Sequence, residues 1–236
     1  MPAKKNLGAI TKPRYLIKIT DDLGSMLSFE SSPRKIVSLV PSITETLVHI
    51  GLENSLIGIT KFCIHPKHLR NDKVVTGGTK NPRIAEIIHL KPDLVFANKE
   101  ENRPEDIIHL KLHMQVFVTD IATIEDVVSF LNKLQLIFTT AVCAPLIQTL
   151  SNLPVASNRE SITCCYLIWK NPWMTVGNDT FIHHMMEIFG FKNVFDEKNR
   201  YPVTTLKDIQ ILQPEVIMLS SEPYPFNKSE DRKSVV

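Results

Sequence analysis

Histidine pairs are the residues of this chain whose spacing could most directly support chemistry. His109 and His113 are four residues apart, so on a helix both would lie on one face, which is the spacing of a zinc-binding helix. The sequence HExxH does not occur and no third ligand is identifiable nearby, so a zinc site built from protein side chains alone is not expected. Two other pairs raise the same question: His65 with His68, and His183 with His184.

Motifs of nucleophilic and phosphate chemistry are missing from the sequence. It contains no GxSxG, no GxxxxGK[ST] and no GxGxxG. Ser42 in LVPSITE follows an expected strand, but Pro41 and Glu45 around it indicate a helix start with a capping box rather than a nucleophile. The expectation is a protein without enzymatic activity. The enzyme alternative is a two-lobed chelatase that uses His65 with Glu100, and a second alternative is an interaction module that binds no ligand.

A dense polar cluster follows an apolar run in KPDLVFANKEEN, residues 91–102. The run from Asp93 to Ala97 is typical of a short buried strand, whereas Asn98 to Asn102 are all polar or charged. A similar polar stretch, SSEPYP, follows the apolar run in PEVIML. Ligands of open α/β sheets bind outside the carboxyl ends of the strands, so both stretches are predicted to lie at a binding edge.

Short strands and helices are expected to alternate over the first half of the chain. YLIKITDDLGSMLSF predicts a hairpin, and RKIVSLV predicts a strand that leads into a helix ending at Gly51. The alternation continues through LIGIT, NPRIAEIIHL, DLVFA, RPEDIIHLKLH and QVFVT. This order of elements predicts a parallel, doubly wound α/β unit.

A longer helix is expected from Thr123. Apolar residues recur at helical spacing through TIEDVVSFLNKLQLIFTTAV, with Thr123 as the cap. SITCCYLIWK then restarts a strand, and DTFIHHMMEIFG predicts a helix that ends at Gly190. The predicted organisation is an N-terminal α/β lobe with a leading hairpin over residues 1–122, a bridging helix over 123–150 and an incomplete C-terminal α/β lobe over 151–236.

An internal echo supports two lobes. IIHLKPDLV (87–95) and IQILQPEVI (209–217) share the frame Ile-x-x-Leu-polar-Pro-acid-aliphatic-aliphatic, which joins a helix to a buried strand. Helix-Pro-strand joints are also common in unrelated α/β proteins. The predicted fold class is α/β, with two doubly wound lobes bridged by one long helix and a second lobe that is shortened.

Composition is that of an ordinary globular protein. The 236 residues are 43% hydrophobic and 22% charged, and a formal net charge of +2 does not favour nucleic acid as a partner. No secretory signal is evident at the N-terminus, and the four cysteines form no CxxC, so a cytoplasmic, reducing location is expected for the chain as given.

Ten stretches of the sequence carry a resemblance to a known family. In order along the chain they are ITDDLG, RKIVSLVPSITETL, GITKFCIHP, GGTKN, LKPDLVFANKEEN, VTD, YLIWKNPWMTVGNDTF, NVF, RYPVTTL and LSSEPYPF. The ordered set resembles the helical-backbone (class III) substrate-binding proteins of ABC transporters, in the branch that carries cobalamin and iron chelates. The resemblance implies a metal chelate, such as cobalamin, an iron-siderophore or haem, held in a cleft between the lobes, and no cofactor of the protein's own.

Carried over by position, the resemblance implies a set of ligand-binding residues. His65 is also the candidate for an axial metal ligand, and aromatic rings suit a large flat ligand because they can stack on it. The implied residues are Ser42, Glu45, Phe62, His65, Lys99, Glu100, Asn102, Trp169, Trp173 and Tyr201.

Two departures from the family bear on its partners. Relatives that deliver to a transporter permease carry one docking acid per lobe, and these positions fall at Ala85 and Lys207, with Glu86 and Asp208 one residue later. Relatives also continue past SSEPYPF with a further strand and helix, so an exposed sheet edge, weak stability or a homodimer is expected here.

Overall fold

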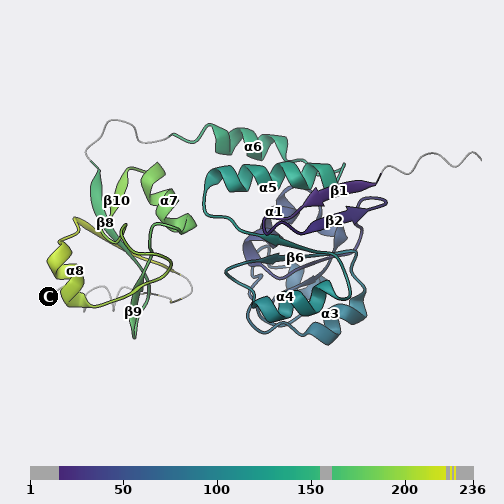
Figure 1. Ribbon diagram of the computed structural model, residues 1–236, viewed down its shortest axis with the longest axis horizontal. Coiled ribbons are helices and arrows are strands. Elements are labelled where there is room, and N and C mark those ends of the chain that lie inside the picture. The colour runs from purple at the N-terminus through teal and green to yellow at the C-terminus, as the bar shows by residue number, and fades with distance from the viewer. Residues whose placement is uncertain (1–15, 155–160, 222–223, 225, 227–236) are drawn as a thin grey trace, which may run out of the picture. The chain divides into compact units, whose positions relative to one another are not determined.

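The computed structural model describes residues 16–154 and 161–221, together with Tyr224 and Phe226. The described chain forms two compact units (Figure 1). The first contains the residues up to Asp120 together with Phe130–Cys143, and the second contains Ile121–Ser129 and the residues from Ala144 onward. Each unit is an α/β structure, and no described helix has the length and apolar character that crossing a membrane requires.

The first unit is built on a parallel sheet with the strand order β5-β4-β3-β6-β7. Its strands are β3 (Ile36–Ser38), β4 (Leu56–Ile59), β5 (Val74–Val75), β6 (Leu94–Asn98) and β7 (Val116–Thr119). A hairpin of β1 (Ile17–Thr20) and β2 (Met26–Phe29) precedes it, paired antiparallel as predicted. The helices of this unit are α1 (Pro41–His49), α2 (Leu69–Asp72), α3 (Ile84–Leu90) and α4 (Pro104–Lys111), with a 3-10 turn at Glu53–Ser55.

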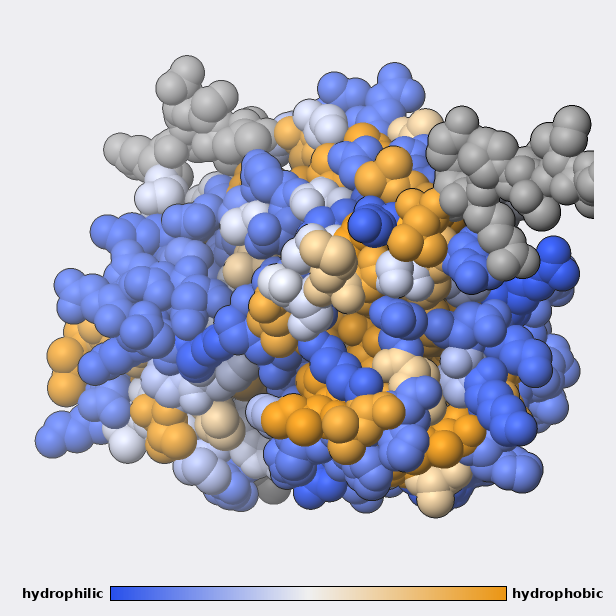
Figure 2. All heavy atoms as spheres, turned by 45° about the vertical axis from the view of Figure 1, so that its right-hand side comes forward, coloured by the Kyte–Doolittle hydropathy of each residue, from blue (hydrophilic) through white to orange (hydrophobic). Residues whose placement is uncertain are grey.

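Both faces of this sheet are buried. Side chains of α3 and α4 form one core with alternate residues of β3, β6 and β7. On the other face, Phe130 of α5 (Ile124–Ile137) lies with its ring centre 5.9 Å from that of Phe96 and 5.7 Å from that of Phe117. Apolar strands covered on both faces are what the continuous hydrophobic runs predicted. On the face of the molecule drawn in Figure 2, hydrophobic patches lie between hydrophilic residues.

The second unit has a mixed sheet centred on β8 (Ile162–Trp169). β8 pairs in parallel with β10 (Phe191–Asn193) and with β12 (Val216–Leu219), and antiparallel with β9 (Trp173–Thr175). β11 (Val203–Thr204) pairs with β9. The helices of this unit are α6 (Ala144–Ser151), α7 (Phe181–Ile188) and α8 (Leu206–Leu212).

Two helix starts test the predicted caps. Thr123 caps α5, because its hydroxyl accepts from the Asp126 N–H at 3.1 Å while the Asp126 carboxylate accepts from the Thr123 N–H at 2.9 Å. The predicted capping box of Ser42 and Glu45 is wrong. Val40 is the N-cap of α1, and its apolar side chain accepts no hydrogen bond from the helix. Pro41 takes the first helical position, where its missing N–H costs nothing.

The range predicted for one bridging helix, residues 123–150, contains two helices. α5 ends at Ile137, and α6 begins at Ala144 with Pro145 as its second residue. Proline fits a first turn but not a helix interior, so a new helix starts there. The predicted domain boundaries stay a prediction.

The internal echo corresponds to the same joint in each unit. α3 and α8 each have seven residues and end on a left-handed residue, Lys91 (φ 50°) and Gln213 (φ 46°). After the proline, the Asp93 carboxylate accepts the N–H of Arg34 at 2.8 Å and of Lys35 at 2.9 Å, directly before β3. Glu215 accepts the N–H of Thr163 at 2.7 Å, at the start of β8. In both units the acid therefore fastens the joint to the neighbouring strand.

Candidate ligand-binding site

The carboxyl ends of the first unit's strands form the candidate site. β3 lies in the centre of the sheet, with β4 on one side and β6 on the other, so the connections leaving β3 and entering β6 run in opposite directions. Ligands of doubly wound sheets bind at this kind of switch point, outside the strand ends. The loops after β3, β5 and β6 meet there.

Asn98 explains the polar cluster that follows β6. Its side-chain amide donates to the Thr119 hydroxyl at 3.0 Å, which fastens the loop to β7. Its side-chain oxygen accepts the N–H of Glu100 at 2.8 Å and of Glu101 at 3.1 Å. The polar residues thus satisfy the backbone where the strand stops, and both Glu100 and Glu101 are partly buried there.

Asn102 ties three of these loops together. Its amide donates to the carbonyl of Leu39 at 3.3 Å and to that of Thr79 at 2.9 Å, and its oxygen accepts the Asn98 N–H at 2.8 Å. The side chain is only 2% exposed. The structure therefore places Asn102 beneath the site as a support, whereas the resemblance implied a direct contact with ligand.

The side chains that reach solvent at this edge come from several elements. Ser42 and Glu45 are exposed on α1, three residues apart on its first turns. Phe62 is 50% exposed, and the Lys61 ammonium lies 5.0 Å from its ring centre. A Cβ at Gly78 would lie 3.3 Å from the Phe62 ring, so the loop after β5 contacts this aromatic side chain.

Charged groups near the Asn98 loop are largely held by protein partners. The Lys99 ammonium pairs with the Asp120 carboxylate at 2.6 Å. Lys80 donates to the carbonyl of Glu100 and so joins the loop after β5 to the loop after β6. Burial raises the pKa of the Glu101 carboxyl, with Lys80 lowering it and Glu100 adding to the rise. The edge is thus mixed in charge, and the ammonium groups of Lys99 and Lys80 already have protein partners.

His65 lies in a different hollow of the first unit. A depression of about 630 Å³ is lined by Ile64, His65, Lys67, Arg70, Asn71 and Val75. Its lining includes none of the other predicted contacts, and it does not include Glu100, the partner of His65 in the chelatase alternative. Within the described residues, no group of three His, Cys, Asp or Glu side chains is arranged to hold a metal ion.

In the second unit an aromatic cluster occupies the carboxyl ends of β8 and β12. The Trp169 and Tyr224 ring centres are 5.4 Å apart, Tyr224 and Phe226 are 4.6 Å apart, and Phe226 stacks on Trp173 at 6.0 Å with planes 7° apart. The Lys170 ammonium lies 5.4 Å from the Trp173 ring centre. The structure therefore brings the two predicted tryptophans into one cluster.

Tyr201 lies apart from this aromatic cluster. It packs against Cys164, Val176 and Met186 on one face of the sheet, whereas Trp173 packs with Cys165 and Leu167 on the other. Neighbouring strand residues point to opposite faces, so Cys164 and Cys165 mark the two sides.

Four residues of the candidate site were not predicted: Lys61, Lys80, Tyr224 and Phe226. Tyr224 and Phe226 belong to the SSEPYPF stretch, whose position after the second Leu-x-Pro frame matches that of NKEEN after the first. The echo was therefore an available signal for these aromatics. The two lysines carried none, because surface lysines are common and their placement depends on the loop path.

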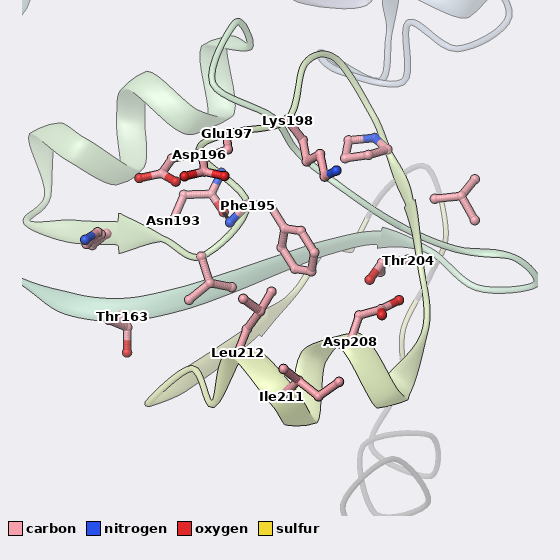
Figure 3. Close-up of a pocket in the computed structure, with 14 residues that line it drawn as sticks. Thr163, Asn193, Phe195, Asp196, Glu197, Lys198, Thr204, Asp208, Ile211 and Leu212 are labelled. Carbon is pink, nitrogen blue, oxygen red and sulfur yellow. Dashed lines mark hydrogen bonds between the residues drawn. The ribbon is translucent and has the colours of Figure 1, made fainter.

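A second hollow lies on the Cys165 face of the second unit (Figure 3). It measures about 640 Å³, and Figure 3 shows the Phe195 side chain between α8 and the turn that follows β10. Its lining includes Thr163, the second residue of β8, but none of the aromatic cluster. It therefore lies away from the strand ends that carry the candidate site.

The two positions where relatives have docking acids are both on the surface. Ala85 and Lys207 are the second residues of α3 and α8, and both are exposed. Glu86 pairs with Arg83, and the Asp208 carboxylate accepts the N–H of Thr205 at 3.0 Å, so the neighbouring acids serve their own helix starts.

Comparison with known proteins gives a consistent result. Residues 36–136 match the family described as periplasmic binding protein. An uncharacterized ABC transporter substrate-binding lipoprotein, YvrC of Bacillus subtilis, is 25% identical over 220 residues, which span 86% of this chain and 69% of YvrC. The vitamin B12-binding protein of Vibrio cholerae is 25% identical over 206 residues, 83% of this chain and 74% of that protein.

Solved structures share the predicted fold. The periplasmic vitamin B12-binding protein BtuF of Vibrio cholerae has a TM-score of 0.70 at 20% identity and covers 86% of this chain and 83% of its own. CeuE of Helicobacter pylori has a TM-score of 0.76 at 14% identity, with 87% and 71% covered. The class III fold predicted from the sequence is confirmed. Periplasmic binding proteins carry ligands and are not enzymes, which agrees with the expected absence of catalysis.

Proposed function

We propose that this chain is a substrate-binding protein for a cobalamin-like or other metal-chelate ligand, of the kind associated with ABC transporters, because residues 36–136 match the periplasmic binding protein family. One observation supports this most directly. Asn102 joins three strand-end loops at the switch point of the parallel sheet, and Phe62 stands half-exposed at that edge. The relatives named for vitamin B12, and solved neighbours named for haem, support the class of ligand.

The proposed contacts divide into polar and aromatic groups. Ser42, Glu45 and Glu100 offer hydroxyl and carboxylate oxygens to amide side arms, and Lys99 can leave Asp120 to meet a carboxylate arm, because both members of that pair are partly exposed. Phe62, together with Trp169 and Trp173, offers ring faces that favour a flat chelate. His65 stays the candidate for an axial metal ligand, and Tyr201 stays a proposed aromatic contact.

An ABC transporter permease is the proposed protein partner, because the relatives are substrate-binding proteins of such transporters. Ala85 and Lys207 provide no docking acids, so this contact is proposed to be weaker than in a relative with two acids. Related proteins are named as periplasmic or as lipoproteins. The cytoplasmic location expected from the sequence stays a prediction.

The test is a titration of the purified chain with aquocobalamin, haem and a ferric siderophore. Quenching of tryptophan fluorescence and the visible band of the ligand report binding. We expect one of the three to bind with one-to-one stoichiometry, and Phe62→Ala to weaken its binding about two- to tenfold, the range that the loss of one aromatic contact gives.

The matched control is Phe189→Ala, because Phe189 is 56% exposed on the second unit and lies outside the candidate site. A shift of the metal band that His65→Ala abolishes would identify the axial ligand. Failure of all three ligands to bind to a folded sample would contradict the proposed function.

A further inference from the structure

The end of α4 carries two exposed histidines that the candidate site does not use. The helical backbone continues past Lys111, because the Met114 N–H donates to the carbonyl of Leu110 at 3.1 Å. His109 and His113 therefore lie one turn apart on the same face, and their ring centres are 5.6 Å apart. Both are exposed, and neither imidazole has a hydrogen bond or ion pair among the residues that the structure describes.

The spacing of the rings suits two ligands of one metal ion. A metal-bound imidazole nitrogen lies about 2.0–2.1 Å from the ion, so two rings on one ion have centres roughly 4.5–5 Å apart. Rotation of two exposed side chains closes the small remaining difference from 5.6 Å.

The charges around the pair leave room for a cation. Lys111, which lies between the two histidines in sequence, points to the hairpin, where its ammonium donates to the Ser25 hydroxyl at 2.6 Å and lies 3.5 Å from the Asp21 carboxylate. Glu105, one turn before His109, carries a negative charge that Arg103 partly offsets at 3.6 Å. The ammonium group of Lys111, the lysine of this helix, is therefore directed at the hairpin.

From these contacts we propose that His109 and His113 form a binding site for one divalent transition metal ion, with water completing its coordination. Two imidazoles favour Cu²⁺ over Ni²⁺ and Zn²⁺, and they exclude Mg²⁺, which prefers oxygen ligands. The site lies near the amino end of β7, whereas the Asn98 loop contacts Thr119 at its carboxyl end, so the metal ion and the chelate occupy opposite edges of the sheet.

The experiment is a calorimetric titration of the whole chain with CuCl₂, NiCl₂, ZnCl₂ and MgCl₂. We expect one Cu²⁺ per chain, weaker binding of Ni²⁺ and Zn²⁺, and none of Mg²⁺. His109→Asn and His113→Asn should each weaken Cu²⁺ binding at least tenfold, and the double variant should lose little more, because either single change already removes the chelate.

The control is His49→Asn, a single exposed histidine in the last turn of α1, which should leave Cu²⁺ binding unchanged. Electron paramagnetic resonance of the copper complex should show coupling to two imidazole nitrogens, and circular dichroism should show that the variants are folded. Undiminished Cu²⁺ binding by the folded double variant, or no Cu²⁺ binding by the parent chain, would overturn the proposal.

Discussion

A single buried amide organises the candidate site at the scale of residues. Asn102 uses both amide hydrogens and its oxygen on Leu39, Thr79 and Asn98, which lie on three different loops. An exposed ligand contact and a buried support can both be asparagines in a strand-end loop, so the residue type alone did not distinguish them. The number of hydrogen-bond partners inside the protein distinguishes the two roles.

Replacing Asn102 by Leu should therefore damage both stability and binding. The change leaves two carbonyls and one N–H without partners in a buried place, and each buried unsatisfied group costs about 1–3 kcal/mol. Because some of these groups will regain water, we expect a loss of about 2–4 kcal/mol in the free energy of unfolding, measured by urea denaturation. Asn152→Ala, at an exposed position, is the control and should change it by less than about 0.5 kcal/mol. An unchanged urea midpoint for Asn102→Leu would show that the three bonds do not support the site.

At the scale of elements, the repeated helix-proline-strand joint was the part of the fold that the sequence predicted best. The frame contains the last residues of a helix, a proline that cannot continue it and the apolar residues of a strand. All three are local signals in the sequence. Its acid was not given a role, because the partners of Asp93 and Glu215 are strands far away in sequence. The short strands β5 and β11, with two residues each, had no periodicity to reveal them.

One group of predicted site residues follows such a joint directly. The Asn98 loop was placed correctly at a strand end, since the polar run begins where the apolar strand stops. His65 and Tyr201 could not be placed, because a hollow or a sheet face depends on how the loops fold back, which no local spacing encodes. The wrong cap at Ser42 has a different origin, because Pro41 is itself a local signal that favours the first helical position.

Glu215 gives the joint of the second unit a dependence on pH. The N–H and hydroxyl of Thr163 both donate to its carboxylate, which lowers the pKa of Glu215 in the folded protein below its ordinary value. A lowered folded pKa means that this contribution is fully present above the unfolded pKa of about 4.5 and is lost as the pH falls through the folded value.

Glu215→Gln should consequently flatten the acid side of the stability curve. We expect the variant to be less stable than the parent at pH 7 and to approach it as the pH falls below about 4, measured by urea unfolding at a series of pH values. Glu187→Gln, which removes a largely exposed carboxylate on α7, is the control. A parallel shift of the whole curve, with no convergence in acid, would contradict a role for the ionised carboxylate.

At the scale of the whole molecule, the edge strand β12 bears on how the chain associates. β12 pairs with β8, and among the described residues no strand pairs with its outer edge. The Ser220 N–H donates to the Leu167 carbonyl at 3.0 Å. In a parallel ladder the backbone groups of alternate residues point to the same neighbour, so those of Met218 and Val216 are also directed at β8. The backbone N–H and C=O groups of Ile217 and Leu219 are directed outward. Val216–Leu219 contains no charge or proline, the features that protect exposed edges, and Ile217 is 45% exposed.

A second copy of the chain can pair with this edge around a two-fold axis. With Met218 opposite its counterpart, Ile217 of one copy faces Leu219 of the other, and both residues have their N–H and C=O groups directed outward, as an antiparallel hydrogen-bonded pair requires. We expect sedimentation velocity to show a concentration-dependent dimer. Ile217→Lys should shift it to the monomer, because a charged side chain opposes edge pairing. Ile211→Lys, which adds the same charge at a 69% exposed position on α8, should leave the dimer in place. A monomer at every concentration, or equal loss of the dimer in both variants, would show that the sheet edge is not the contact.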